Sequence, residues 1–125
     1  MMNKTKNTTT HSGVLNSLFG GVTAKIMDFL IVHNEWDYSK QDIANYSGTS
    51  LRHAIITIEK LEKYNFIKHT RNVGAAHMYQ FNNDNPTLVK FAHCARQIAA
   101  DEFQKFADQQ QQEKTSKEMV VAVPA

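Results

Sequence analysis

The sequence contains a single cysteine, Cys94, among its 125 residues. No disulfide can form within the chain, and this is typical of a protein from a reducing compartment. Hydrophobic residues make up 42% of the chain, which is enough to bury a core. The length suits one domain with tails.

Long apolar runs are also absent. No run approaches the roughly 18 residues that a membrane span needs. The first segment, MMNKTKNTTTHSG, is polar and lacks the apolar centre of a signal peptide. We therefore expect a cytoplasmic protein that contacts no membrane, with residues 1–13 as a disordered polar tail.

The sequence lacks the common catalytic patterns. Cys94 has no histidine base placed opposite it, because His93 is its neighbour on a helix and projects in a different direction. The pair Gly20-Gly21 precedes a helix but lacks the lysine pattern of a phosphate-binding loop. We expect neither an enzyme nor a bound cofactor.

A strong charge of either sign is missing as well. The net charge is +2, which neither establishes nor excludes a nucleic-acid partner. The distribution is more informative, because residues 49–82 hold five lysines and arginines against two glutamates, a local charge of +3. Positive charge is therefore concentrated in residues 49–82, and a local patch of this kind would suit a nucleic-acid partner.

The stretch SKQDIANYSGTSLRHAIITIEKLEKYNF, which begins at Ser39, has the pattern of two helices joined by a tight turn. Ser39 and Asp42 are spaced as in a capping box at the start of the first helix. Gly48 can adopt the left-handed conformation that ends this helix, and Ser50 (or Thr49) can cap the next one. An apolar stripe at spacings of three and four predicts the inward face of the second helix: Leu51, Ala54 or Ile55, Ile58 and Leu61.

Two helical segments precede this stretch. Residues 14–19 predict a short helical turn, and residues 22–33 predict a helix that is apolar nearly all round. Such a helix is buried on both sides, by the helix-turn-helix on one side and by the C-terminal helix or another subunit on the other. Residues 34–38 predict a loop or a brief strand, in which we expect Trp36 to be a hydrophobic plug rather than a base-stacking residue.

The segments 66–71 and 77–82 alternate apolar and polar residues with period two, and Gly74 lies between them. They predict a β-hairpin with a loop of about five residues. Two helices followed by such a hairpin form a winged helix-turn-helix, in which the hairpin is the wing. His69 and His77 can oppose each other across the hairpin, but a metal site needs about four ligands, so we expect no metal.

A long helix follows the hairpin. Asn85 can cap it, Pro86 suits its first position, and no breaker occurs before about residue 112. Its apolar stripe can pair with a second copy or pack back on its own domain, and we favour the homodimer. The predicted interface also takes two residues from the earlier helix: Met27, Ile31, Leu88, Phe91, Ala92, Ala95, Ile98, Ala99, Phe103 and Phe106.

The predicted organisation is therefore a winged helix-turn-helix domain at residues 14–82, a dimerisation helix at 83–112 and a flexible tail at 113–125. The fold class is mainly α with a small β-hairpin. The apolar run 120–123 is too short to fold alone, so the tail is either disordered or a docking peptide for an unknown protein partner.

The residues 18–82 resemble the winged helix-turn-helix domains of small prokaryotic, particularly archaeal, transcriptional regulators of the ArsR/MarR type. LFGGVTAKIMDFLI and the segment YSKQDIANYSGTSLRHAIITIEKLEKYNFIKHTRNVGAAHMYQFN carry this resemblance. Two features differ from the pattern: Asn65 stands where these domains usually have glycine, and the wing carries few arginines. The resemblance implies a nucleoid-associated regulator whose long helix forms a homodimer.

A recognition helix presents its first turns to base edges in the major groove. Arg52 is the strongest candidate, because its guanidinium matches guanine O6 and N7, and helix N-termini suit phosphates. The predicted DNA-binding residues are Lys40, Gln41, Thr49, Ser50, Arg52, His53, Ile56, Thr57, Lys60, Lys68, His69, Arg71 and Asn72.

The predicted function is sequence-specific binding of double-stranded DNA as a homodimeric transcriptional regulator. Two alternatives remain open from the sequence. One is a DNA-binding protein of plasmid partition or chromatin organisation. The other is a winged-helix adaptor that binds proteins and not DNA.

Overall fold

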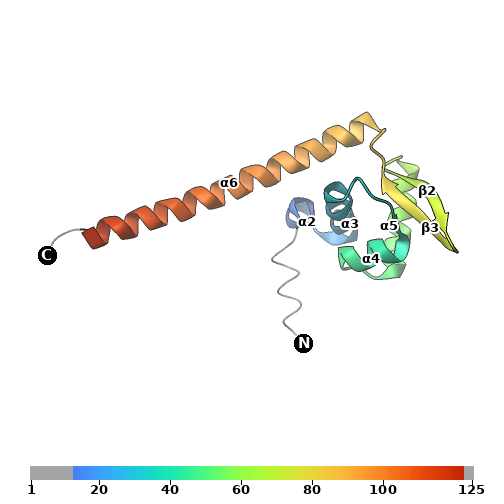
Figure 1. Cartoon of the computed structure of the whole chain (residues 1–125), viewed down its shortest axis with the longest axis horizontal. Helices are drawn as coiled ribbons and strands as arrows, with labels where there is room; N and C mark the ends of the chain where they lie inside the picture. Colours follow the sequence, from blue (N-terminus) through green and yellow to red (C-terminus); the bar gives the residue numbers. More distant parts are fainter. Residues whose placement is uncertain (1–12, 123–125) are drawn as a thin grey trace.

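The computed structural model describes residues 13–122, and side chains from residue 13 to residue 115. Helices form the body of the domain, a hairpin lies at one end, and one long helix leaves the body (Figure 1). The elements in chain order are α2 (Val14–Phe19), α3 (Gly21–Val32), β1 (Tyr38–Ser39), α4 (Lys40–Ser47), α5 (Leu51–Lys63), β2 (Ile67–Val73), β3 (Ala76–Phe81) and α6 (Pro86–Ala122). This confirms the predicted fold class.

The first helix begins near the predicted N-terminal tail, and the last helix extends into the predicted C-terminal tail. Residues 1–12 of the predicted N-terminal tail lie outside the described residues, whereas Gly13 is the N-cap of α2. The predicted end of the last helix near residue 112 is wrong, because α6 continues to Ala122. The Gln-rich segment 109–112 contains good helix formers, so nothing in it stops the helix. No helix within residues 13–122 has the length and apolarity needed to cross a membrane.

The core lies around α3. Ile26 and Leu30 are fully buried, and Met27 and Ile31 are buried beside them. One side of α3 packs on α4 and α5, as predicted. The first turns of α6 contribute to the same core, and Arg96 on α6 donates a hydrogen bond of 3.0 Å to the carbonyl oxygen of Ile31. Helix α2 also packs on α3, so the further partners of the apolar helix are α2 and the first turns of α6, both from the same protomer.

Helix α2 depends on one carboxylate from α3. The two oxygens of Asp28 accept hydrogen bonds from the backbone N–H groups of Leu15 (3.0 Å) and Asn16 (2.8 Å). These are orphan donors at the start of a helix, which need an acceptor. A Cβ atom on Gly13 would lie 2.3 Å from Cγ of Asp28, so the close approach requires glycine there.

The two helices of the helix-turn-helix begin and end as predicted. Ser39 Oγ accepts from the N–H of Asp42 at 3.1 Å, and Asp42 accepts from the N–H of Ser39 at 3.4 Å. Gly48 has φ 72° and ends α4 in the left-handed conformation. Ser50 rather than Thr49 caps α5, since its hydroxyl accepts from the N–H of His53.

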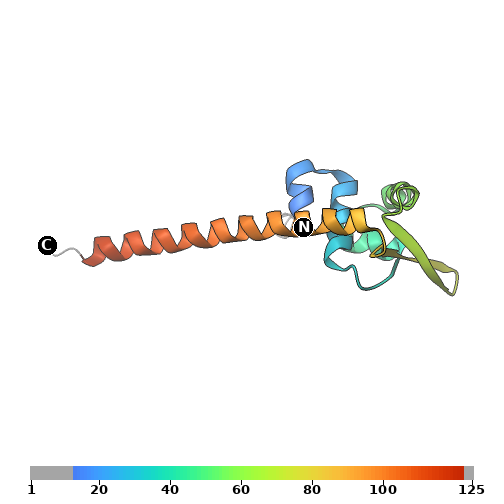
Figure 2. The same ribbon diagram turned by 90° about the horizontal axis from the view of Figure 1, so that it is seen from above.

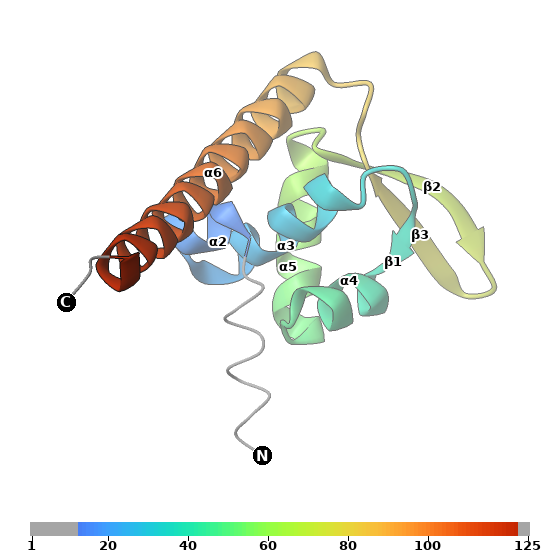
Figure 3. The ribbon, with the colours of Figure 1, turned by 60° about the vertical axis from the view of Figure 1, so that its left-hand side comes forward.

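The three strands form one antiparallel sheet in the order β1-β3-β2 (Figure 3). The prediction of a five-residue loop in the hairpin is wrong. Val73 pairs with Ala76, so only Gly74 and Ala75 lie between the strands, and Gly74 has φ 61°. Asn72, Val73 and Ala76 continue the ladder beyond the two alternating segments, which the period-two pattern alone could not show.

Strand β2 contains a β-bulge. His69 pairs with Tyr79 and Arg71 pairs with the next residue, Met78, so Thr70 has no partner in the ladder. A one-residue shift moves every following side chain to the other face. Arg71 therefore lies on the face opposite to that of His69, whereas strict alternation would place both on one face.

Trp36 lies in the segment between α3 and β1. Its side chain is 67% exposed, so the prediction of a hydrophobic plug is wrong. The polar residues around it explain this: the carbonyl of Asn34 accepts hydrogen bonds from Gln80 and Asn83, which holds the loop against the sheet without using the indole.

Candidate nucleic-acid interface

The first turns of α5 present a polar surface away from the core. Ser50, Arg52, His53 and Ile56 are exposed there. No ion pair or hydrogen bond of the Arg52 side chain occurs within the described residues. The ring Nδ1 of His53 lies 2.8 Å from Ser50 Oγ, so the cap also orients this imidazole.

The predicted contact of Thr57 with DNA is wrong. Thr57 is only 5% exposed and lies beside Ala54, Ile58 and Leu61 in the buried face of α5. Residues three and four apart share one helix face, so Thr57 belongs to the core stripe. The exposed surface of α5 that could contact DNA is correspondingly narrower than the sequence indicated.

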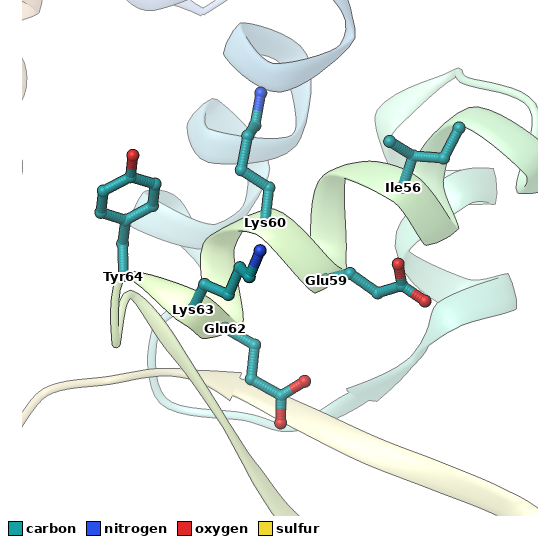
Figure 4. A pocket seen from close by; sticks show the side chains of 6 residues that line it. All are labelled: Ile56, Glu59, Lys60, Glu62, Lys63 and Tyr64. Atoms are coloured by element: carbon teal, nitrogen blue, oxygen red, sulfur yellow. The ribbon is translucent and has the colours of Figure 1, made fainter.

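The second half of α5 has mixed charge. A shallow open hollow of about 640 Å³ lies along its outer face, lined by Ile56, Glu59, Lys60, Glu62, Lys63 and Tyr64 (Figure 4). Lys60 points toward α3, where its ammonium donates to Thr23 Oγ1 at 3.0 Å. Its predicted contact with DNA would require that bond to break. Two glutamates nearby would repel phosphate, so the positive part of α5 is its beginning.

The start of α4 and the turn after it hold the other predicted helix-end contacts. Lys40 Nζ lies 5.6 Å from the ring centre of Tyr79, and Gln41 donates to Asn45. The hydroxyl of Thr49 is buried and has no hydrogen-bond partner in the part of the chain that the structure describes. A contact of that hydroxyl with phosphate would require the side chain to become more exposed, and the contact of Thr49 with DNA stays a prediction.

The wing side chains predicted to reach DNA are all engaged with neighbours. Lys68 forms an exposed ion pair of 3.0 Å with Asp84. His69 Nε2 lies 2.7 Å from Asn72 Oδ1, and its ring centre lies 5.2 Å from that of His77. This pairing matches the predicted approach of the two histidines, but no group of three or more metal-binding side chains occurs within the described part of the chain.

Arg71 is held by Asp37, a residue that the sequence analysis did not single out. Arg71 Nε donates to Asp37 Oδ2 at 2.9 Å, and Nη2 donates to Oδ1 at 3.2 Å. Thr70 Oγ1 donates to Oδ2 at 2.6 Å. These bonds, first that from Arg71 and then that from Thr70, lower the pKa of Asp37 to about 2. No sequence signal marks Asp37, because the bulge that brings Thr70 and Arg71 together is not visible in the pattern.

The predicted dimer interface divides into two groups. Five residues are buried inside the protomer, so the prediction that they lie between subunits needs correction: Met27, Ile31, Leu88, Ala92 and Ala95. The other five lie on the half-buried or exposed part of α6: Phe91, Ile98, Ala99, Phe103 and Phe106. An apolar stripe in the sequence does not show whether the same protomer or a second subunit covers it. The sequence alone therefore could not separate these two groups. Leu18 and Phe19 are exposed apolar side chains on α2 that the predicted interface did not include, and α2 contacts α6 (Figure 2).

The chain matches no protein-family model and no curated protein sequence. Solved structures do match it. MepR, a transcription regulator of the Staphylococcus aureus multidrug efflux pump MepA, has a TM-score of 0.60 at 12% identity, over 98% of this chain and 94% of that one.

Two further structures support the same likeness. A mutant of Lactococcus lactis ZitR in complex with DNA has a TM-score of 0.55 at 17% identity, over 81% of this chain and 73% of its own. The transcriptional regulator BldR from Sulfolobus solfataricus has a TM-score of 0.56 at 9% identity, over 97% and 89%. This chain has their winged helix-turn-helix fold. ZitR is a zinc-responsive MarR family member, so the predicted resemblance is confirmed at the level of fold.

Proposed function

We propose that the protein binds double-stranded DNA sequence-specifically as a homodimeric transcriptional regulator. The observation that carries the proposal is Arg52, exposed and unpaired within the described residues at the first turn of α5. A guanidinium in this place can donate two hydrogen bonds to one guanine in the major groove. Three compared structures are of transcription regulators or of a DNA complex, and this favours DNA over other partners.

The neighbours of Arg52 suit the same role. Ser50 and His53 are exposed on the same turn, and Ile56, one turn further on, offers an apolar contact for a thymine methyl group. Lys40 and Gln41 at the start of α4 are placed to contact phosphate, as helix N-termini commonly are. The wing adds Lys68, His69 and Asn72, of which Lys68 would exchange its exposed ion pair with Asp84 for a phosphate.

The homodimer rests on α6. With 37 residues it is about 55 Å long at 1.5 Å per residue, and most of that length projects beyond the domain (Figures 1 and 2). Phe103 and Phe106 continue the stripe that packs Leu88 and Ala92 on the protomer's own core, yet they are 72% and 58% exposed. A second copy of the chain would cover them with its own α6 and with Leu18 and Phe19 of its α2.

A protein-binding adaptor is the second candidate. Trp36 and Tyr46 are both largely exposed, and exposed aromatic side chains are enriched at protein interfaces. The mixed charge of the second half of α5 also suits a protein better than DNA. The adaptor would bind through these aromatic residues and would not need Arg52.

Fluorescence anisotropy with duplexes selected from genomic DNA separates the two functions. The proposal predicts binding that weakens as salt rises, with a linear dependence of log K on log salt concentration. A selected duplex should bind at least about 1,000-fold more tightly than a scrambled one. A Kd weaker than about 10⁻⁴ M at low salt would contradict DNA binding and would leave the adaptor as the better account.

A further inference from the structure

Thr70 and Arg71 contact the same carboxylate although they are consecutive residues of one strand. Successive side chains of a regular strand point to opposite faces, so only one of them could normally reach Asp37. The bulge removes this restriction, because Thr70 has no partner in the ladder and Arg71 is paired with Met78. The Asp37 side chain, only 15% exposed, is thus the acceptor for both residues of the bulge.

The position of Asp37 in the chain shows which parts of the domain this contact connects. Asp37 comes directly before β1, and β1 pairs with β3 on the side away from β2. Bonds from β2 to Asp37 therefore pass over the middle strand and connect the two outer strands. The last residue of β1, Ser39, is also the N-cap of α4, so Asp37 connects the wing to the start of the helix-turn-helix.

We propose that Asp37, Thr70 and Arg71 form a wing brace that fixes the hairpin relative to α4 and α5. In this account Arg71 is a positioning residue for the wing and not a DNA ligand. The inference rests on the proposed function, because DNA binding is what the brace serves. It replaces the predicted DNA contact of Arg71, whose guanidinium is already bound to a carboxylate.

Such a brace would help a protein that contacts DNA through both α5 and the wing. A two-stranded hairpin is at best marginally stable by itself, and the outer half of this one is exposed on both faces. Ordering it only on binding would subtract from the affinity, whereas a wing that is already ordered avoids that cost. The brace stabilises the strand on which Lys68, His69 and Asn72 lie.

Electrostatics and positioning predict opposite results for Asp37→Asn. Removing a negative charge near a DNA-binding surface should strengthen binding to a polyanion. Removing the brace should weaken binding, even though the net charge becomes more favourable. We expect Asp37→Asn and Arg71→Gln each to weaken binding to the selected duplex about three- to tenfold, and the double variant to lose no more than the worse single variant, as for coupled residues.

Asp84→Asn is the matched control. This substitution also removes the carboxylate partner of a positively charged wing residue, Lys68. The Lys68–Asp84 ion pair has a similar length, 3.0 Å, but it is exposed and lies outside the bulge. We expect it to leave affinity unchanged or to raise it slightly. The dependence of log K on log salt should keep its slope in Arg71→Gln, whereas loss of a phosphate contact would reduce the slope by about 1.

Equal or tighter binding by Asp37→Asn, together with weaker binding and a reduced slope in Arg71→Gln, would overturn the brace and restore Arg71 as a DNA ligand. Hydrogen exchange of the free full-length protein tests the brace without DNA, because it measures how well the backbone amides of β2 are protected. We expect faster exchange of β2 amides in Asp37→Asn and wild-type exchange in Asp84→Asn. Unchanged exchange in Asp37→Asn would overturn the brace even if DNA binding failed altogether, so the two failures are distinguishable.

Discussion

Asn65 has a positive φ of 62° at the junction between α5 and β2. Asparagine tolerates this left-handed conformation better than most residues, although glycine accepts it most easily. This explains how asparagine can stand where similar domains have glycine. The carbonyl of Asn65 also accepts hydrogen bonds from Asn82 and Asn85, which fixes the junction between α5, the hairpin and α6.

Asn65→Ala should therefore destabilise the protein by roughly 1 kcal/mol, because a Cβ-bearing residue without a polar side chain pays the full cost of the left-handed region. Asn65→Gly should be close to wild type. Chemical denaturation measures both free energies of unfolding. Equal stability of the alanine and glycine variants would show that the backbone conformation at this junction carries no such cost.

Gly13→Ala tests the cap of α2. The new Cβ would displace the Asp28 side chain, whose two oxygens accept the N–H groups of Leu15 and Asn16. We expect a loss of roughly 1–3 kcal/mol, which is typical for buried or capping donors left without an acceptor. Ser17→Ala, on the exposed side of the same helix, is the control and should change stability by less than about 0.5 kcal/mol. If the two variants unfold alike, Asp28 is not the cap that holds α2.

At the scale of elements, the sequence predicted interactions between residues that are close in the chain, but it did not predict interactions between distant residues. The capping box at Ser39, the left-handed Gly48 and the Asn85 cap of α6 each involve residues within four positions, and all three are confirmed. The bulge at Thr70 and the burial of Thr57 depend on neighbours far away in the chain. Likewise, the stripe of α6 showed that something covers it, but not that its first turns pack on the protomer's own α2 and α3.

The Asp37–Arg71 contact has a pH dependence with a defined sign. The folded-state pKa of Asp37 is about 2, below its ordinary value of 3.8. The contact therefore contributes stability that is present at pH values above this ordinary pKa and is lost as the pH falls toward 2. NMR titration of the Asp37 carboxyl carbon should give a midpoint near 2 in wild type and a higher midpoint in Arg71→Gln. A wild-type midpoint near 4 would mean that the ion pair is not formed in solution.

The outer half of α6 is the element on which oligomeric state depends. Replacing Phe103 and Phe106 together by serine removes the two most exposed large apolar side chains between residues 86 and 115 of α6 without touching the core. We expect the variant to be monomeric by light scattering at concentrations where wild type is dimeric, and to bind DNA much more weakly because one half-site is lost. Val89→Ser near the beginning of α6 is the control. A wild-type monomer at micromolar concentration would contradict the role given to this helix.

At the scale of the whole molecule, the proposed homodimer would bind DNA as a rigid pair of domains. Each protomer would contribute one recognition helix and one braced wing, and α6 would set the distance between the two copies. Such dimers bind half-sites about one helical turn apart, roughly 34–36 Å. Insertion of five base pairs between half-sites turns them to opposite sides of the duplex and should reduce affinity nearly to that of a single half-site, measured by the same anisotropy assay.

The measurement that tests the central claim most directly is the binding of Arg52→Ala and Arg52→Lys to the selected and scrambled duplexes. If Arg52 reads a guanine, both variants should lose roughly 1–3 kcal/mol on the selected duplex, because lysine keeps the charge but not the planar pair of donors. On the scrambled duplex Arg52→Lys should bind like wild type. Unchanged affinity of both variants for the selected duplex would contradict the account, because the first turn of α5 would then not read the DNA.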